Sequence, residues 1–172
     1  MNDALYDLDQ LFTDPKFILV FSIIFLTAFL SFAVRRVFSK FEKQTKKTAN
    51  LWDDAFVAAA KKPAGWLVWV VGILWAIQIM AESTGSDLEK LIYPLRFISV
   101  VSLFGFFLTK FITEVEFASI AIGGDVTTAN AAGKLLRISV TITVVLSVLQ
   151  TLGFSISGVL AFGGVGGIAV GF

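Results

Sequence analysis

Long uncharged stretches alternate with short blocks of charge along this sequence. A helix needs about 20 mostly apolar residues to cross the hydrocarbon core of a bilayer. Three stretches approach this length in the first two thirds of the chain, at 17–34, 64–81 and 91–111. The third contains Arg96 and Lys110, whose long side chains can reach outward from near the helix ends. The pattern therefore predicts three membrane-spanning helices in this region.

The final part of the chain carries no charged residue from Ile138 to Phe172. A single helix of this length would measure about 50 Å, which exceeds the roughly 30 Å of the hydrocarbon core. The segment 153–158 (GFSISG) offers a turn near the middle. We therefore expect a fourth span at about 135–154 and a fifth at about 156–172. The predicted fold class is an all-α membrane protein with five transmembrane helices per subunit.

The segments between the spans are predicted to be short or irregular. Residues 1–16 are acidic and weakly amphipathic, which suits a short helix lying in the membrane interface. Residues 35–62 form a basic connection in which Asn50 can cap a short helix, with Asp53 and Asp54 in its first turn. We interpret this carboxylate pair as helix-terminal rather than catalytic.

Two glycines interrupt the mixed segment 112–134. Gly123 and Gly124 are expected to break any continuous helix there. A polar turn is expected at 82–90.

The distribution of Lys and Arg predicts the orientation. If the N-terminus is outside, the inside segments 35–63 and 110–137 hold eleven of the 14 basic residues. The positive-inside rule favours this choice. The N-terminus is then periplasmic and the end of the last helix cytoplasmic.

Composition excludes several functional classes. Charged residues make up 16% of the chain, against about 25% in soluble domains. The net charge of +1 gives no reason to expect nucleic acid as a partner. Without histidine or cysteine the chain has no His-based triad and no Cys/His zinc site. We expect no enzyme activity, catalytic residue or metal site.

The residues 164–169 match the glycine spacing of a dinucleotide-binding fingerprint. No strand precedes them and no acidic residue follows them, so no cofactor is expected.

The last predicted helix has an unusual distribution of small residues around its axis. At 100° per residue, an apolar stripe forms on one side; its members are Ala161, Val165, Ile168 and Phe172. Small residues flank the stripe on both sides: Gly163, Gly164, Gly167 and Gly171 on one, and Gly158, Gly166 and Ala169 on the other. Small residues let membrane helices approach closely, so two such flanks suggest a ring of identical helices. The stripe would then line a pore, with Ile168 and Phe172 as a hydrophobic gate that closes by dewetting.

Two simpler interpretations accompany this one. A glycine-rich helix can pack against other helices of its own subunit. Ionisable residues near helix ends can be membrane-interface anchors rather than an ion path. We assign the anchoring role to Arg35, Arg36, Trp66, Arg96, Lys110 and Arg137.

The segment Gly153–Phe172 closely resembles the pore helix of the small-conductance mechanosensitive channel family of bacteria. Leu51–Asp54 followed by Pro63 resembles the segment before the second helix of larger members. Asp125–Thr128 leading into Gly133–Arg137 resembles the stretch before the penultimate helix.

The resemblance implies an extended member with five helices, forming a homoheptameric channel in the bacterial inner membrane. Such a channel opens under membrane tension and releases ions and small solutes under hypoosmotic stress. Its partners would be copies of itself, membrane lipids and permeating ions. The family's two pore-sealing positions map onto Ile168 and Phe172. Residues 17–134 would be outer, membrane-sensing helices and 135–172 the penultimate and pore-lining helices, with a cytoplasmic vestibule expected after 172.

A small helical-bundle transporter is the alternative function. It would need polar residues near the midplane, for which Gln78 and Gln150 are the main candidates. No inverted repeat relates the two halves. A membrane-embedded enzyme would need convergent reactive side chains at depth, and the spans offer none.

Overall fold

Five helices follow one another in the computed structural model, which describes residues 15–45, 51–84 and 88–171. They are α2 (Pro15–Thr45), α3 (Leu51–Thr84), α4 (Leu88–Ala121), α5 (Val126–Thr151) and α6 (Ile156–Gly171). These ranges contain no strand, which confirms the all-helical class. The predicted N-terminal interfacial helix falls on 1–14, outside the described residues, apart from its last two positions.

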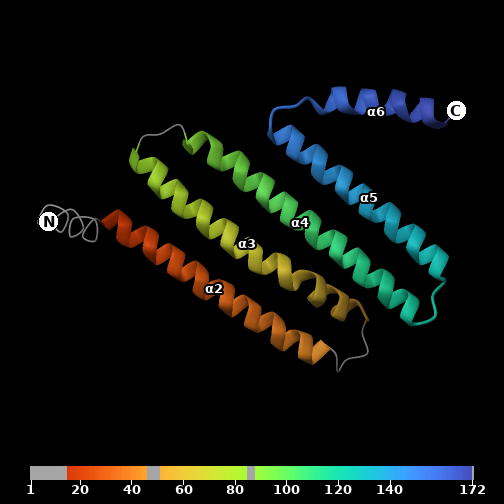
Figure 1. Cartoon of the computed structure of the whole chain (residues 1–172), viewed down its shortest axis with the longest axis horizontal. Coiled ribbons are helices and arrows are strands. Elements are labelled where there is room, and N and C mark those ends of the chain that lie inside the picture. The colour runs from red at the N-terminus through yellow and green to blue at the C-terminus, as the bar shows by residue number, and fades with distance from the viewer. Residues whose placement is uncertain (1–14, 46–50, 85–87, 172) are drawn as a thin grey trace, which may run out of the picture.

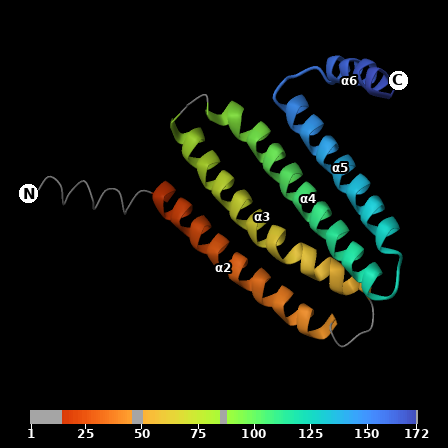
Figure 2. The same ribbon diagram turned by 45° about the vertical axis from the view of Figure 1, so that its right-hand side comes forward.

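Helices α2 to α5 lie side by side in chain order and alternate in direction, as both ribbon views show (Figure 1, Figure 2). Within the described part of the chain, each helix packs only against its neighbours in sequence. Helix α6 turns aside at the end of α5 and, among the described residues, contacts no helix other than α5. The fold is therefore a single open row rather than a closed bundle.

Four of the helices, α2 to α5, are long and apolar enough to cross a membrane. Many of their large apolar side chains are exposed, including Phe21 (73%), Phe25 (68%) and Trp66 (64%). In a membrane such side chains face lipid at no cost. Helix α6 is apolar but has only 16 residues, which is shorter than the candidate membrane spans. The chain is a multi-pass membrane protein with four candidate spans, and the fifth span stays a prediction.

The helices are longer than the hydrophobic pattern predicts. The segment 35–62, interpreted as a connection, is helical on both sides, because α2 continues to Thr45 and α3 begins at Leu51. With 34 residues each, α3 and α4 are about 51 Å long, more than the bilayer with its headgroups. Charged side chains mark where a helix leaves the hydrocarbon, but they do not end it.

The start of α3 agrees with part of the prediction. Asp53 and Asp54 lie in its first turn, as expected, while Asn50 lies outside the described residues. Pro63, placed just before the second span, is instead buried inside α3.

The two glycine turns lie where the sequence predicts them. Gly123 has φ +92° and Gly153 has φ +90°, in the left-handed region that favours glycine. After the first turn, Asp125 caps α5 by accepting a 2.7 Å hydrogen bond from the Thr128 backbone N–H. The side-chain and backbone hydrogen bonds from Thr128 lower the pKa of Asp125 below its ordinary value. Residues 126–134, assigned to a connection, therefore belong to α5.

Small residues let α2, α3 and α4 pack closely. The buried residues of α3 are mostly alanines: Ala55, Ala59, Ala60, Ala76 and Ala81. Gly72 of α3 faces Thr27 of α2, which is 7% exposed. A Cβ on Gly72 would lie 2.8 Å from the Thr27 Cβ, closer than side-chain carbons pack. This glycine therefore sets the distance between α2 and α3.

Replacing Gly72 with leucine is expected to separate α2 from α3. Overpacking a well-fitted contact costs about 1–3 kcal/mol. Thermal unfolding of the full-length protein in detergent should show a lower Tm for this variant. Ala58→Leu adds bulk at an exposed position of the same helix and serves as the control. Equal Tm values for the two variants would contradict the close contact.

Candidate functional site

Helix α6 begins at Ile156, directly after the turn at Gly153, and carries no charge. Six of its 16 residues are glycines: Gly158, Gly163, Gly164, Gly166, Gly167 and Gly171. A methyl group placed on any of these would meet no other part of the described chain within 4 Å. Ala169, the remaining member of the small flanks, is exposed as well. Both flanks of the helix are therefore open within one subunit.

The apolar stripe of α6 is equally uncovered. Val165 is 70% exposed and Ile168 is 64% exposed, and Ala161 is exposed too. Phe172, the second residue of the predicted gate, lies outside the described residues. Among the described residues α6 contacts only α5, so the alternative in which it packs its small faces against other helices of its own subunit finds no support there.

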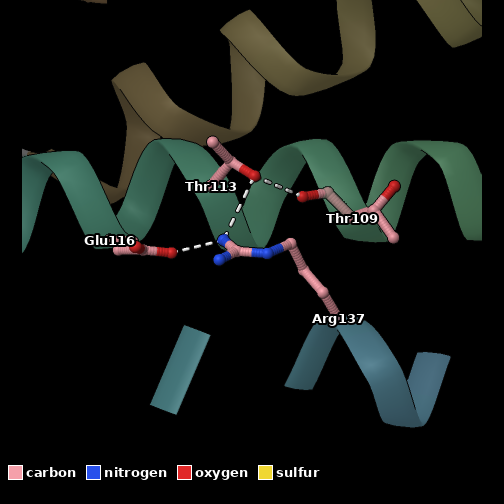
Figure 3. A network of polar contacts seen from close by, with 4 residues as sticks. All are labelled: Thr109, Thr113, Glu116 and Arg137. Atoms are coloured by element: carbon pink, nitrogen blue, oxygen red, sulfur yellow. Dashed lines mark hydrogen bonds and ion pairs between the residues drawn. The ribbon is translucent and has the colours of Figure 1, made fainter. Parts of the chain in front are cut away.

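Helix α5 connects this exposed helix to the rest of the subunit, and its polar attachment to α4 centres on Arg137 (Figure 3). The Arg137 Nη1 donates to the Glu116 carboxylate and, at 3.4 Å, to the Thr113 hydroxyl. The Thr113 hydroxyl in turn donates to the Thr109 carbonyl at 2.9 Å. The Glu116 side chain is only 11% exposed and that of Arg137 is 32% exposed. The interface thus contains a partly buried, charge-assisted contact.

The sequence predicts a membrane-anchoring role for Arg137 and gives no sign that Glu116 is its partner. Glu116 lies on α4, 21 residues earlier and across a turn. Gly133, one turn before Arg137 on α5, is buried where the Glu116 carboxylate approaches, but the sequence shows only a glycine there and not its burial.

Arg96 also has a partner on a neighbouring helix. Its Nη2 donates to the Gln78 Oε1 on α3 at 2.6 Å, and the Gln78 Nε2 donates to Glu82 at 3.0 Å. Gln78, a candidate for the transporter alternative, is therefore engaged in holding α3 to α4.

The remaining anchor candidates lie at exposed positions. Arg35 lies across Gly65 of α3, with its Nε 3.4 Å from where a Cβ of that glycine would be. Arg36 lies over the Phe32 ring, 6.0 Å from its centre. Lys110 and Trp66 are exposed on α4 and α3. In the described residues no cluster of His, Cys, Asp and Glu could hold a metal ion.

Comparison with known proteins bears most directly on α5 and α6. A family model described as "Mechanosensitive ion channel, transmembrane helices 2/3" matches residues 134–172. The chain is also 32% identical over 124 residues to the low conductance mechanosensitive channel YnaI of Escherichia coli K12. The C-terminal helices are thus similar to those of the MscS-like channel family.

The MscS-like match places the family's second and third transmembrane helices on α5 and α6. The alignment with YnaI covers 64% of this chain and 36% of that relative, so the chain spans about a third of the relative's length. No solved structure matches the chain significantly. The family is one of ion channels rather than enzymes, and the resemblance recognised in the sequence is confirmed.

Proposed function

We propose that this chain is one subunit of a channel that membrane tension opens, with α6 lining the pore. The observation that supports this most directly is that both small-residue flanks of α6 are open within the subunit. Small faces on membrane helices are contact surfaces. Two of them on one helix suit a ring, in which each copy meets a different neighbour on each side. Seven copies, as the family resemblance suggests, would form the pore.

The gate in this proposal is formed by the apolar stripe. Ile168 is 64% exposed in the single subunit, and a ring would turn it toward the axis with Phe172 beyond it. Val165 and Ala161 would line the wider part of the pore. Narrow apolar constrictions lose their water and block ions without any charged plug.

Helices α2 to α4, the part of the row farthest from α6, would sense membrane tension. Tension favours whichever state occupies more area in the membrane, so the two states must differ in how their helices contact lipid. Helices α2 to α4 expose Phe and Trp side chains along their lengths, which suits that role. Between α3, α4 and α5 lies an apolar cavity of about 280 Å³, lined by Trp52, Phe111, Val115 and Leu136 among others. Its lining is compatible with lipid acyl chains as partners.

The proposed setting is the bacterial inner membrane, where the channel would release ions and small solutes under hypoosmotic stress. The excess of basic residues in 35–63 and 110–137 supports a periplasmic N-terminus and a cytoplasmic end of α6. Gln78, a polar candidate for the transporter alternative, accepts a hydrogen bond from Arg96 across the α3–α4 contact, which argues against that alternative.

Patch clamp of the full-length protein in liposomes under stepped suction tests the proposal. We expect discrete openings whose probability rises with tension, and sevenfold symmetry in electron micrographs of the purified protein. A monomer or dimer without a central pore, or membranes that stay silent up to rupture, would contradict it.

A further inference from the structure

The open row restricts how force can pass through one subunit. Helices α2, α3 and α4 are linked to α5 and α6 only across the α4–α5 interface and through the turn at residues 122–125, as far as the described residues show. Displacement of the outer helices can therefore reach α6 within a subunit by these two routes. The turn contains Gly123 at a positive φ and Gly124, so it is the more pliant route. The packed interface is the stiffer one.

The polar contacts described across this interface all involve Arg137 (Figure 3). Its partner Glu116 is 11% exposed, so water screens the pair far less than an ion pair on a protein surface. Charge-assisted hydrogen bonds are also about twice as strong as neutral ones. The interface contains one directional contact that resists sliding between α4 and α5.

Gly133 makes room for this contact. It is the one buried residue of α5, and a Cβ there would lie 2.8 Å from the Glu116 Cδ. It would lie 3.3 Å from the Arg137 Nη1 as well. Any larger side chain at 133 would displace the carboxylate from the guanidinium. A glycine and an arginine one turn apart on α5 thus provide the space and the charge that bind a carboxylate from α4.

We propose that the Glu116–Arg137 pair is the tie through which the outer helices pull α5, and with it α6, when the membrane is stretched. This inference rests on the function proposed above. Without the tie, α4 slides past α5 and part of the outward displacement is lost before it reaches the pore helix. The channel then needs more tension to open. Glu116 and Arg137 act here as positioning residues, since neither lies on the pore helix.

Arg137→Gln in the full-length protein removes the tie, and Lys134→Gln is its matched control. Lys134 lies three residues earlier on α5 and is exposed, so the control removes the same charge without affecting the pair. At the midpoint tension of the wild type, we expect the open probability of Arg137→Gln to fall about tenfold, the size of a typical coupling between sites. Lys134→Gln should stay near the wild type. Glu116→Gln, which weakens the pair from the other helix, should shift in the same direction as Arg137→Gln.

A disulfide elsewhere in the interface distinguishes lost coupling from general damage. The Cβ of a residue at 105 would lie 3.5 Å from the Val144 Cβ, within the range that disulfides span. The chain contains no native cysteine. Gly105→Cys/Val144→Cys should therefore join α4 to α5 covalently under oxidising conditions. Added to Arg137→Gln, this bond should restore opening at the wild-type tension, and dithiothreitol should abolish the rescue.

The outcomes separate the two proposals. If the wild type does not respond to suction, the proposed function fails. If the wild type responds but Arg137→Gln matches Lys134→Gln, or opens at lower tension, the tie is wrong. Should Arg137→Gln fail to fold, the Gly105→Cys/Val144→Cys disulfide in an otherwise wild-type chain still tests whether α4 and α5 move together. If the tie makes α4 and α5 move as a unit, oxidation should leave gating unchanged. A channel blocked by oxidation would show that the two helices must separate during opening, and would contradict the tie.

Discussion

Serine in place of Ile168 is expected to open the channel at lower membrane tension than the wild type requires. In the proposed ring Ile168 forms part of the dry constriction, and it is already 64% exposed in the single subunit. Shielding an isoleucine side chain from water is worth about 1.5–3 kcal/mol. Every subunit contributes one such side chain, and about 1.4 kcal/mol corresponds to a tenfold change in an equilibrium. The open probability at a fixed subthreshold tension should therefore rise by well over tenfold.

Patch clamp of reconstituted protein under stepped suction measures this shift. Val159→Ser is the matched control, because Val159 lies on the face of α6 roughly opposite the stripe. It exchanges a similar branched side chain for the same hydroxyl without touching the proposed pore. A gating curve for Ile168→Ser that overlays the wild type, or a control that shifts as much, would remove Ile168 from the gate.

Leucine at either small flank of α6 is expected to abolish the ring. In a ring each interface pairs one flank of a helix with the other flank of its neighbour. Gly167→Leu blocks one flank and Gly166→Leu blocks the other, so each substitution alone should prevent closure. Contacts between membrane helices depend on the close approach that glycine allows. We expect the assembled species to be largely replaced by smaller ones.

Native mass spectrometry of the detergent-solubilised full-length protein reports the subunit number directly. Ala58→Leu adds bulk at an exposed position of α3, away from both flanks of α6, and should leave assembly intact. If only one of the two glycine variants disrupts assembly, α6 packs through a single face, as a symmetric dimer would. Full assembly of both variants would place the subunit contacts outside α6.

The sequence predicts the helix positions well and the helix ends poorly. Gly123 and Gly153 end helices through a backbone conformation that only glycine adopts easily, so those turns could be located from the residues themselves. Charged blocks were a poor guide, because Arg35 and Arg36 mark the edge of the apolar region while the helix continues to Thr45. Asp125 caps α5, although the hydrophobic pattern predicted the start of the fourth span near residue 135.

The candidate site was also predictable only in part. The positions of residues around the axis of α6 depend only on local periodicity, so its apolar stripe and small flanks could be predicted from the sequence. The partner of Arg137 depends on which helices become neighbours, and no local pattern specifies that Glu116 lies opposite it. Gly133 is visible in the sequence, but its burial becomes clear only when a second helix lies beside it.

The row in which every helix touches only its chain neighbours also bears on how the protein is made. A contact between sequence neighbours can form as soon as the second helix enters the membrane, without waiting for a distant segment to be synthesised. Helices α2, α3, α4 and α5 can therefore dock one after another in the order of translation. Among the described residues helix α6 contacts only the end of α5, so in the proposed ring its final packing waits for other copies of the chain.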